Sequence, residues 1–304
     1  MSVSTAFLKF GAINCEPYGG LGNRLLTIVS LYRIAKLNEL GFKVGWAPMP
    51  GVLVTSMDHF FDLPFQVYPI QRQSTACDVV PQPDNGRWYL PDEGFSKSSR
   101  NAAHIGGRFF HCLWRRQDLE GLNYDKLLSL TLEFRELLRH LICPSFYLKE
   151  KIAQYSIPQE FDIGIHVRVA LANDFAYGVE YEWPDLDYAT LLARIFDTLN
   201  DAGSTSAFVA SPSRLLVERI CKDLSARGLN TYHALDCSND LNNPFDLYSF
   251  LDFHMLTKCR SIFRRAKTTF AAVAGLALAD NEYTLSDDYA ITKRRPLLLT
   301  GSAL

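Results

Sequence analysis

The chain has 304 residues, of which 48% are hydrophobic and 21% charged, an ordinary globular balance that excludes a disordered, collagen-like or coiled-coil protein. This length suits two compact domains. Lys and Arg total 31 and Asp and Glu 33, which gives a formal net charge of -2. A general nucleic-acid binder would carry a strong basic excess, so we expect no nucleic-acid partner.

The seven cysteines are odd in number and form no C-x-x-C pair, a pattern that predicts reduced thiols rather than a disulfide framework or a zinc site. No secretory signal is evident at the N-terminus. The longest apolar run, Phe270–Ala279, falls short of the roughly 18 residues that a membrane span needs. We therefore expect a soluble, cytoplasmic protein with at most peripheral membrane contact. The basic runs Arg115–Arg116 and Lys293–Arg295 are expected to be solvated surface, or to supply that contact.

The first half of the chain opens with the pattern of a βαβ unit. A strand is expected over Ala6–Asn14, a turn over Cys15–Gly22, a helix over Asn23–Leu40 that ends at Gly41, and a strand over Phe42–Trp46. This order indicates an α/β fold. Residues 48–107, rich in Pro and Gly, are expected to be loops, and Leu122–Cys143 a helix.

In the second half, strands and helices alternate regularly, which predicts a doubly wound parallel sheet. We place the boundary near Pro144–Pro158, with domains at residues 1–150 and 151–304, and expect two Rossmann-like domains facing a cleft. The expected elements are strands at Phe161–Val167, Ser206–Ala210, Leu229–Leu235 and Arg260–Phe263, and helices at Tyr188–Ala202 (capped by Asp187), Ser213–Arg227, Phe245–Cys259 and Thr269–Ala279.

A glycine-rich turn, Gly19–Arg24, lies between the first strand and its helix. Glycines there let the backbone approach a ligand, and a helix N-terminus favours an anion. A dinucleotide fingerprint needs a third glycine where Leu25 stands, so the NAD interpretation is weak. The structural alternative is a plain glycine turn with a solvated Arg24.

The second half offers polar side chains where its strands end and its helices begin. In open α/β sheets, ligands bind at the carboxyl ends of the strands. His166 and Arg168, two residues apart on an extended segment, should project to one face, and an arginine suits phosphate. Thr268, Thr269 and Phe270 open the last helix, where hydroxyls and amides form a phosphate cradle, or merely an N-cap beside a solvated basic face of Arg264, Arg265 and Lys267.

Two further polar groups follow the same logic. Ser211 and Ser213 lie between a strand and a helix, where Ser213 also serves as an ordinary N-cap. Asp252 lies on the helix before the last expected strand. Two roles are open for its carboxylate: a hydrogen bond to the amide edge of a nucleotide base, or an ion pair with Arg260. Together these positions suggest a nucleotide-diphosphate pocket in the second domain.

Taken in order, these segments resemble the fucosyltransferase superfamily, which spans α1,2-, α1,6- and protein-O-fucosyltransferases and includes the rhizobial nodulation enzymes. Gly20–Leu25, followed by a helix and a strand ending in Trp46, resembles the N-terminal motif of its bacterial members. His166–Arg168 resembles the start of the superfamily's H-x-R-R-x-D motif. Phe208–Ser213 and Leu251–Phe270 are similar to its second and third motifs.

The resemblance implies a GT-B fold, with an acceptor-binding N-terminal domain and a C-terminal domain that binds the GDP-sugar donor. It implies an inverting glycosyltransferase that moves a sugar, most simply L-fucose from GDP-fucose, to a hydroxyl of an oligosaccharide or glycoconjugate, as in polysaccharide biosynthesis. The enzyme that the resemblance implies needs no metal and no cofactor beyond the GDP-sugar co-substrate. The catalytic residues that it implies are Arg168, which stabilises the leaving GDP, and Asp174 as general base. The donor-binding residues that it implies are Gly20, Gly22, Asn23, Arg24, His166, Arg168, Ser211, Ser213, Asp252, Thr268, Thr269 and Phe270.

The sequence departs from the motif at two positions. Val169 stands where the motif has its second arginine, and Leu171 where it has its aspartate. Glu180 and Glu182 are further candidates for the general base near Asp174.

Three other functions stay open. A metal-dependent glycosyltransferase with another nucleotide sugar would use Asp185-Leu186-Asp187 as a D-x-D motif, although these residues suit an N-cap better. A glycan- or nucleotide-binding pseudoenzyme fits the loss of the second arginine at Val169. An NAD-dependent oxidoreductase would use the glycine turn.

Overall fold

The computed structural model describes residues 11–17, 19–37, 39–48, 53–71, 80–81, 88–89, 102–107, 124–154, 157–169, 187–234, 244–266 and 268–297, and the following account concerns these residues alone. The chain divides into two compact units, one that ends at Ser145 and one that begins at Phe146. Each is described by itself.

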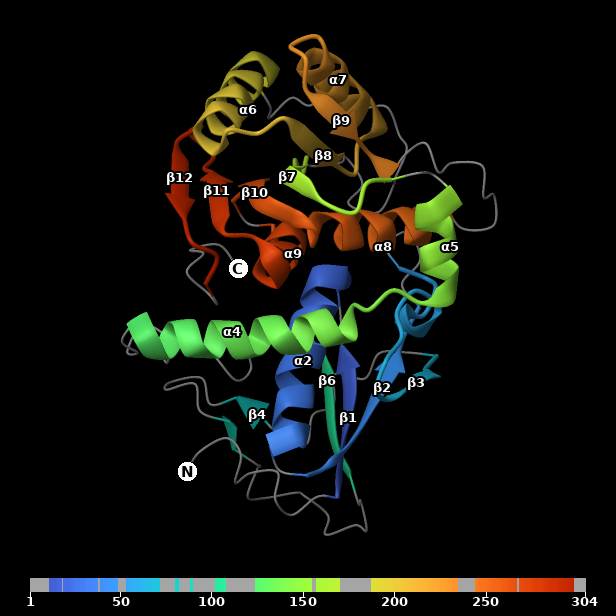
Figure 1. Ribbon diagram of the computed structural model, residues 1–304. Coiled ribbons are helices and arrows are strands. Elements are labelled where there is room, and N and C mark those ends of the chain that lie inside the picture. The colour runs from blue at the N-terminus through green and yellow to red at the C-terminus, as the bar shows by residue number, and fades with distance from the viewer. Residues whose placement is uncertain are drawn as a thin grey trace. The chain divides into compact units, whose positions relative to one another are not determined.

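The first unit is built on a sheet of four parallel strands in the order β3-β2-β1-β6. Helix α2 follows β1 and packs against it and against α4 (Figure 1). An ion pair between Arg33 and Glu133, with N–O distances of 2.8 Å, joins the two helices. The elements are β1 (Ala12–Pro17), α2 (Leu21–Leu37), β2 (Gly41–Trp46), the 3-10 helix η1 (Met57–His59), β3 (Gln66–Pro69), β4 (Val80–Pro81), β5 (Trp88–Tyr89), β6 (Ala102–Gly107) and α4 (Tyr124–Leu141).

The second unit is a six-stranded sheet in the order β12-β11-β10-β7-β8-β9, parallel except for β12. From β7 the chain winds outward through β8 to β9, then returns to β10 on the other side of β7 and winds outward again. This is the doubly wound order of a Rossmann-like domain. The elements are α5 (Phe146–Gln154), β7 (Phe161–His166), α6 (Tyr188–Ala202), β8 (Ser206–Ala210), α7 (Arg214–Ser225), β9 (Asn230–Tyr232), α8 (Pro244–Leu256), β10 (Cys259–Arg265), α9 (Thr269–Leu278), β11 (Asn281–Leu285) and β12 (Ile291–Arg294).

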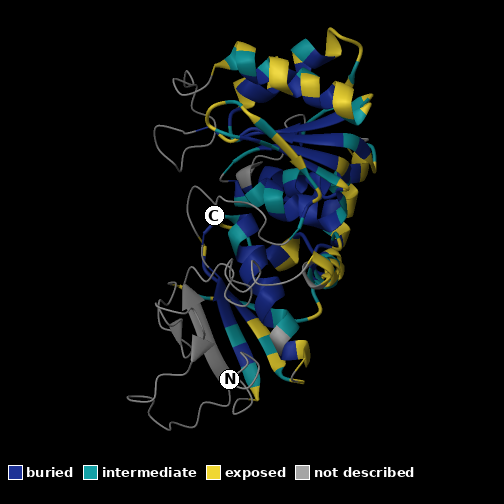
Figure 2. Ribbon diagram, turned by 90° about the vertical axis from the view of Figure 1, so that its left-hand side faces the viewer, coloured by how far each residue is buried: buried dark blue, intermediate teal, exposed yellow. Residues whose placement is uncertain are grey.

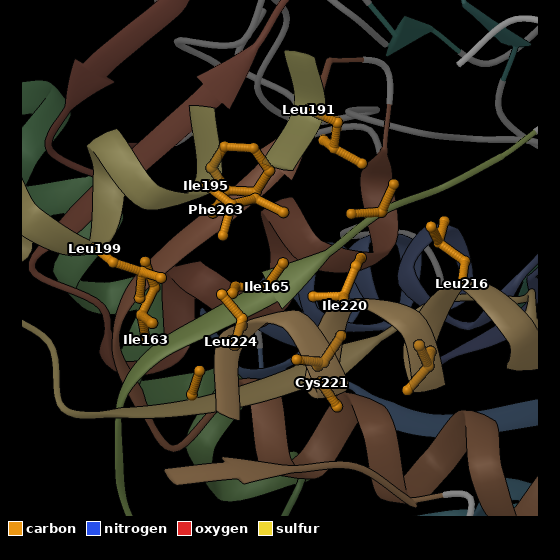
Figure 3. Close-up of a cluster of buried hydrophobic side chains, with 14 of the residues drawn as sticks. Ile163, Ile165, Leu191, Ile195, Leu199, Leu216, Ile220, Cys221, Leu224 and Phe263 are labelled. Atoms are coloured by element: carbon orange, nitrogen blue, oxygen red, sulfur yellow. The ribbon is translucent and has the colours of Figure 1, made fainter. Parts of the chain in front are cut away.

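One face of this sheet, under α6 and α7, holds a hydrophobic cluster (Figure 3). From β7 it takes Ile163 and Ile165, and from the segment after the strand Val167 and Val169, the last only 2% exposed. These alternate residues face α6 and α7 because side chains of an extended chain alternate between the two faces. Figure 2 shows the strands buried and the outer sides of the covering helices exposed.

The opposite face lies against α8 and α9, and its closest packing is at Gly164. A Cβ atom there would lie 2.7 Å from Leu256 Cδ2, 2.8 Å from Cys259 Sγ and 2.9 Å from Ile262 Cδ1. Glycine therefore allows α8 to approach β7 and β10 closely, next to the strand ends that carry the polar residues.

Several predicted elements are confirmed, among them α6, β8 and the Asp187 cap, whose side chain accepts hydrogen bonds from the amides of Ala189 and Thr190. Other predictions were wrong. The first strand runs to Pro17, beyond the predicted Asn14, and α2 begins at Leu21. The expected loop region contains β3 and β6, and the two final strands, β11 and β12, were not predicted. These strands are short and carry polar residues, so their sequences lack a clear alternation.

Within the described helices, none combines the length and the apolar character that a bilayer crossing demands.

Substituting Gly164→Ala should lower the free energy of unfolding by about 1–3 kcal/mol, because the new Cβ overpacks three side chains. Gly275→Ala is the matched control. Its Cβ would lie 3.2 Å from Ile262 Cγ1, and alanine gains about 1 kcal/mol of helix propensity in α9, so little net change is expected. Chemical denaturation of the two variants measures both effects; equal stability would contradict the close packing at Gly164.

Candidate functional site

The carboxyl ends of β7 and β10 meet at the centre of the second sheet. From β7 the chain continues to α6 on one face, and from β10 to α9 on the other (Figure 1). This is the topological switch point of a doubly wound sheet, where open α/β folds bind their ligands.

His166 and Arg168 lie on the α8–α9 side at the end of β7. Val167 and Val169, the residues that alternate with them, belong to the cluster under α6 and α7. The prediction that His166 and Arg168 share a face is therefore confirmed. His166 is 6% exposed, whereas Arg168 is exposed.

The buried imidazole of His166 is neutral across the physiological pH range. Burial, together with the nearby positive charges of Arg168 and Arg264, lowers the pKa of His166 to about 3. The ring stacks on Phe270, in the first turn of α9, with centroids 5.3 Å apart. Its Nδ1 atom has no hydrogen-bond partner among the described residues. A neutral imidazole so placed can exchange a hydrogen bond with a ligand without adding charge.

Among the residues that the structure describes, no side chain caps the N-terminus of α9. The hydroxyl of Thr268, the N-cap residue, instead donates a hydrogen bond of 2.8 Å to the carbonyl of Arg265. The amides of the first turn are thus left without the acceptor that a capping side chain provides, and Thr269 and Phe270 are partly exposed. Such a helix end favours an anion.

Ser211 and Ser213 hold the N-terminus of α7. The Ser213 hydroxyl accepts a hydrogen bond from the amide of Leu216 at 3.3 Å, and the Ser211 hydroxyl accepts one from the amide of Ser213 at 3.2 Å. The capping role of Ser213 is confirmed. Both serines are buried and follow β8, the strand next to β7.

Asp252, on α8, is partly buried, and burial raises its pKa well above the usual value of 3.8. Its suggested partner Arg260 instead forms an ion pair with Glu160 at 3.3 Å. Burial favours the protonated carboxyl, which can both donate and accept hydrogen bonds, as reading a base edge requires.

In the first unit, the glycine turn is supported from within by Arg24. This side chain is completely buried; its Nε donates to the carbonyl of Gly19 at 2.8 Å and its Nη1 to that of Ala47 at 3.0 Å, and its guanidinium lies 4.2 Å from the ring centre of Trp46. The expectation of a solvated Arg24 was wrong. Gly19, with φ of 92°, needs the freedom of glycine.

The other glycines of the turn lie at the start of α2. Gly20 precedes the helix and is partly exposed, and Gly22 and Asn23 belong to its first turn. No described residue of the second unit is placed relative to them.

A cluster of charged side chains was missed by the sequence analysis. Arg264, at the end of β10, and Arg294, on β12, both donate to Oε1 of Glu282 on β11. Lys293 forms an ion pair of 2.7 Å with Asp201. The expectation that Lys293–Arg295 is solvated surface was therefore wrong for Arg294, which pairs with buried Glu282, whereas Lys293 and Arg295 are exposed. The available signal was Arg264 directly after the apolar pair Ile262 and Phe263, in a strand whose middle is buried.

The candidate general bases, Asp174, Glu180 and Glu182, lie outside the described residues, as does Asp185 of the possible D-x-D motif. Asp187, the other acid of that motif, caps α6. No group of His, Cys, Asp or Glu side chains suited to a metal ion occurs in the part of the chain that the structure describes.

Two successive α/β units on parallel sheets form the architecture of GT-B glycosyltransferases. Comparison with solved structures bears this out. NodZ α1,6-fucosyltransferase co-crystallised with GDP matches with a TM-score of 0.53 at 14% identity, over 94% of this chain and 99% of that one. Fucosyltransferase NodZ from Bradyrhizobium gives 0.54 at 13% identity, over 94% and 99%. POFUT1 in complex with GDP gives 0.54 at 10% identity, over 88% and 94%.

Arabidopsis thaliana FUT1, solved as a variant with GDP, matches with a TM-score of 0.53 at 15% identity, over 91% of this chain and 70% of that one. No family model and no curated protein matches the sequence. The chain therefore has the GT-B fold of these fucosyltransferase structures, as the sequence predicted.

The position of Val169 leads to a prediction. Val169→Arg, which restores the second arginine of the motif, should lower the free energy of unfolding by about 3 kcal/mol or more, because it places an unpaired charge in an apolar cluster. Val169→Ile, which keeps the site apolar, should cost far less. Chemical denaturation distinguishes the two, and an arginine variant as stable as the wild type would show that this side chain reaches solvent.

Stability should also fall in acid because of His254, which is 2% exposed. Burial and the charge of Lys258 lower the pKa of His254 to about 3, below the value of 6.5 expected in the unfolded chain. Its contribution to stability is thus present above pH 6.5 and is lost as the pH falls toward 3. Between about pH 5 and 6, His254→Gln should reduce the slope of unfolding free energy against pH by about 1.4 kcal/mol per unit.

Denaturation of both proteins at pH 8, where histidine is neutral in the folded and unfolded states, gives the packing cost alone. An unchanged slope in the variant would mean that His254 titrates normally in the folded protein.

Proposed function

We propose that this protein is an inverting glycosyltransferase that moves a sugar, in the first instance L-fucose from GDP-fucose, to a hydroxyl of a glycan acceptor. The observation that carries the proposal is the switch point of the second sheet, where Arg168 and the uncapped N-terminus of α9 lie beside a neutral His166. This is a site for an anion of the diphosphate class. The solved structures with the same fold include fucosyltransferases crystallised with GDP and soaked with GDP-fucose.

In the proposed reaction, the acceptor oxygen attacks the anomeric carbon while the bond between that carbon and the β-phosphate oxygen breaks. Negative charge then develops on the leaving diphosphate. Arg168 and the first-turn amides of α9 stabilise that charge, with Thr268 and Thr269 at the same helix end. One preorganised donor of this kind contributes about 3 kcal/mol to the transition state. The electron pair of the broken bond leaves with GDP.

The acceptor hydroxyl gives its proton to a carboxylate, for which we propose Asp174. The nucleoside part of the donor is assigned to Asp252 at the base edge, with His166, Phe270, Ser211 and Ser213 around it. Gly20, Gly22, Asn23 and Arg24 are proposed as donor-binding residues of the first unit, where Arg24 acts by holding the glycine turn.

One observation favours a second candidate. Val169 is part of the core, so the segment after β7 supplies one arginine, Arg168, where the motif has two. A protein that binds a GDP-sugar without transferring it would account for this loss. Release of GDP from GDP-fucose, measured apart from binding, separates the two functions.

Thermal shift should first show which nucleotide binds. We expect GDP to raise the melting temperature without magnesium, since a ligand at 100 times its dissociation constant stabilises by about 2.7 kcal/mol. UDP, ADP, NAD and buffer, each with and without magnesium, complete the panel. A shift with UDP that requires magnesium would favour the metal-dependent alternative, and one with NAD alone would favour the oxidoreductase.

Arg168→Gln should abolish detectable release of GDP from GDP-fucose, a loss of about 100-fold or more, because one preorganised donor contributes that much. The melting temperature should stay near that of the wild type, since Arg168 is exposed. Arg260→Gln is the matched control: an exposed arginine at the opposite end of the sheet, paired only with exposed Glu160 in the described structure. Near-normal turnover by the Arg168 variant would refute the assignment.

A further inference from the structure

Arg264, which the sequence suggested as part of a solvated basic face before the last helix, is instead a buried arginine at the switch point. It lies on β10 directly opposite His166 on β7, in the register of the parallel pair, so both side chains leave the same face of the sheet. The side chain is 3% exposed. Its charge is near enough to His166 to help lower the pKa of the imidazole.

The guanidinium of Arg264 is held from one side. Its Nη2 lies 3.0 Å from Oε1 of Glu282, which is 4% exposed, and its Nη1 lies 3.4 Å from the carbonyl of Arg265. The same Glu282 oxygen also accepts hydrogen bonds from Arg294, at 2.6 and 2.9 Å, and one from Thr284. Burial raises the pKa of Glu282, but the two guanidinium groups outweigh this effect and lower it, so the carboxylate stays ionised.

Two features of Arg264 remain unsatisfied. Its Nε is buried and has no hydrogen-bond partner among the described residues, and its carboxylate partner is shared with a second arginine. An arginine cannot lose its charge, and a buried donor without an acceptor costs about 1–3 kcal/mol. An anion bound at this point would satisfy both.

The arrangement also accounts for the missing arginine of β7. Val169 faces α6 and α7, so a longer side chain at that position would enter the core rather than join His166 and Arg168. Arg264 comes from the neighbouring strand to the correct face, next to the uncapped end of α9.

We propose that Arg264 is a second phosphate-binding arginine of the donor site, which contacts the diphosphate together with Arg168 and is positioned by Glu282. This inference rests on the proposed function for the identity of the nucleotide. The inference goes beyond the proposed function because it assigns a phosphate contact to Arg264 on β10. The motif places both of its arginines directly after β7.

The test compares affinities for GDP, pyrophosphate and guanosine, measured by calorimetry on the whole chain. The variants are Arg264→Gln, which removes the charge, and Arg264→Lys, which keeps the charge but loses Nε. Glu282 keeps Arg294 as a partner in both, which favours folding. Arg260→Gln, on the same strand at its exposed end, is the control. Melting temperatures without ligand show whether each variant is folded.

We expect Arg264→Gln to weaken GDP and pyrophosphate binding about tenfold or more, the value of a charge-assisted hydrogen bond, with guanosine binding unchanged. Arg264→Lys should weaken both diphosphates by less. A merely structural role would weaken guanosine and GDP equally. Diphosphate affinities equal to those of the wild type in a folded Arg264→Gln variant would overturn the proposal; if that variant does not fold, equal affinities in Arg264→Lys would do so.

A different set of affinities would refute the proposed function rather than the role of Arg264. Wild-type protein that binds pyrophosphate or UDP but not GDP, with the binding lost in Arg264→Gln, would support the phosphate contact and refute the GDP-sugar assignment. Wild-type protein that binds no diphosphate would overturn both.

Discussion

The alternation of side chains along β7 and the segment that follows it is the constraint on which the site depends. Beyond the last residue of the strand, the chain stays extended because the amide of Val167 donates to the carbonyl of Ala210 on β8, at 3.1 Å. Val167 and Val169 can then enter the core, and His166 and Arg168 must face α8 and α9. Burial of the valines thus fixes the direction of His166 and Arg168, so core packing and the candidate site use alternate positions of one segment.

Close packing on the second face has an electrostatic consequence. Gly164 lets α8 approach the sheet, and two residues further on His166 is only 6% exposed, so a charged imidazole there would be costly. Burial and the charges of Arg168 and Arg264 lower the pKa of His166 to about 3 and favour the neutral imidazole. The positive charge of the site comes from groups that cannot lose a proton, and from the amides of a helix whose N-cap hydroxyl is turned away. Such a site offers the same charge to an anion over a wide pH range.

Local signals made much of the second unit predictable from the sequence. Asp187 and Ser213 are helix caps whose partners lie within three residues, and the alternation around His166 is visible in the sequence itself. The cluster of Arg264, Glu282 and Arg294 is different, because its members come from three strands and meet only through the sheet. The burial of Arg24 likewise depends on a distant partner, the carbonyl of Ala47 after β2. The sequence shows only that Arg24 lies in the first turn of a helix, a position that suggests exposure to solvent. Sequence patterns indicate which face of a strand is buried and which residue caps a helix. They do not show which polar groups, distant in the chain, form hydrogen bonds with one another.

The likeness to fucosyltransferase structures at 10% to 15% identity agrees with this division between local signals and distant contacts. What such distant chains share is the winding of the sheet, and the winding alone brings the ends of β7 and β10 and the start of α9 together. The diphosphate that we propose there would require positive charge at that place, not an arginine from a particular strand. Since residues in register on parallel neighbours leave the sheet on the same face, an arginine on β10 can reach the region served by an arginine on β7. The arginine that the motif lacks at Val169 can therefore be replaced in space, because Arg264 on the neighbouring strand β10 brings the same charge to that face of the sheet.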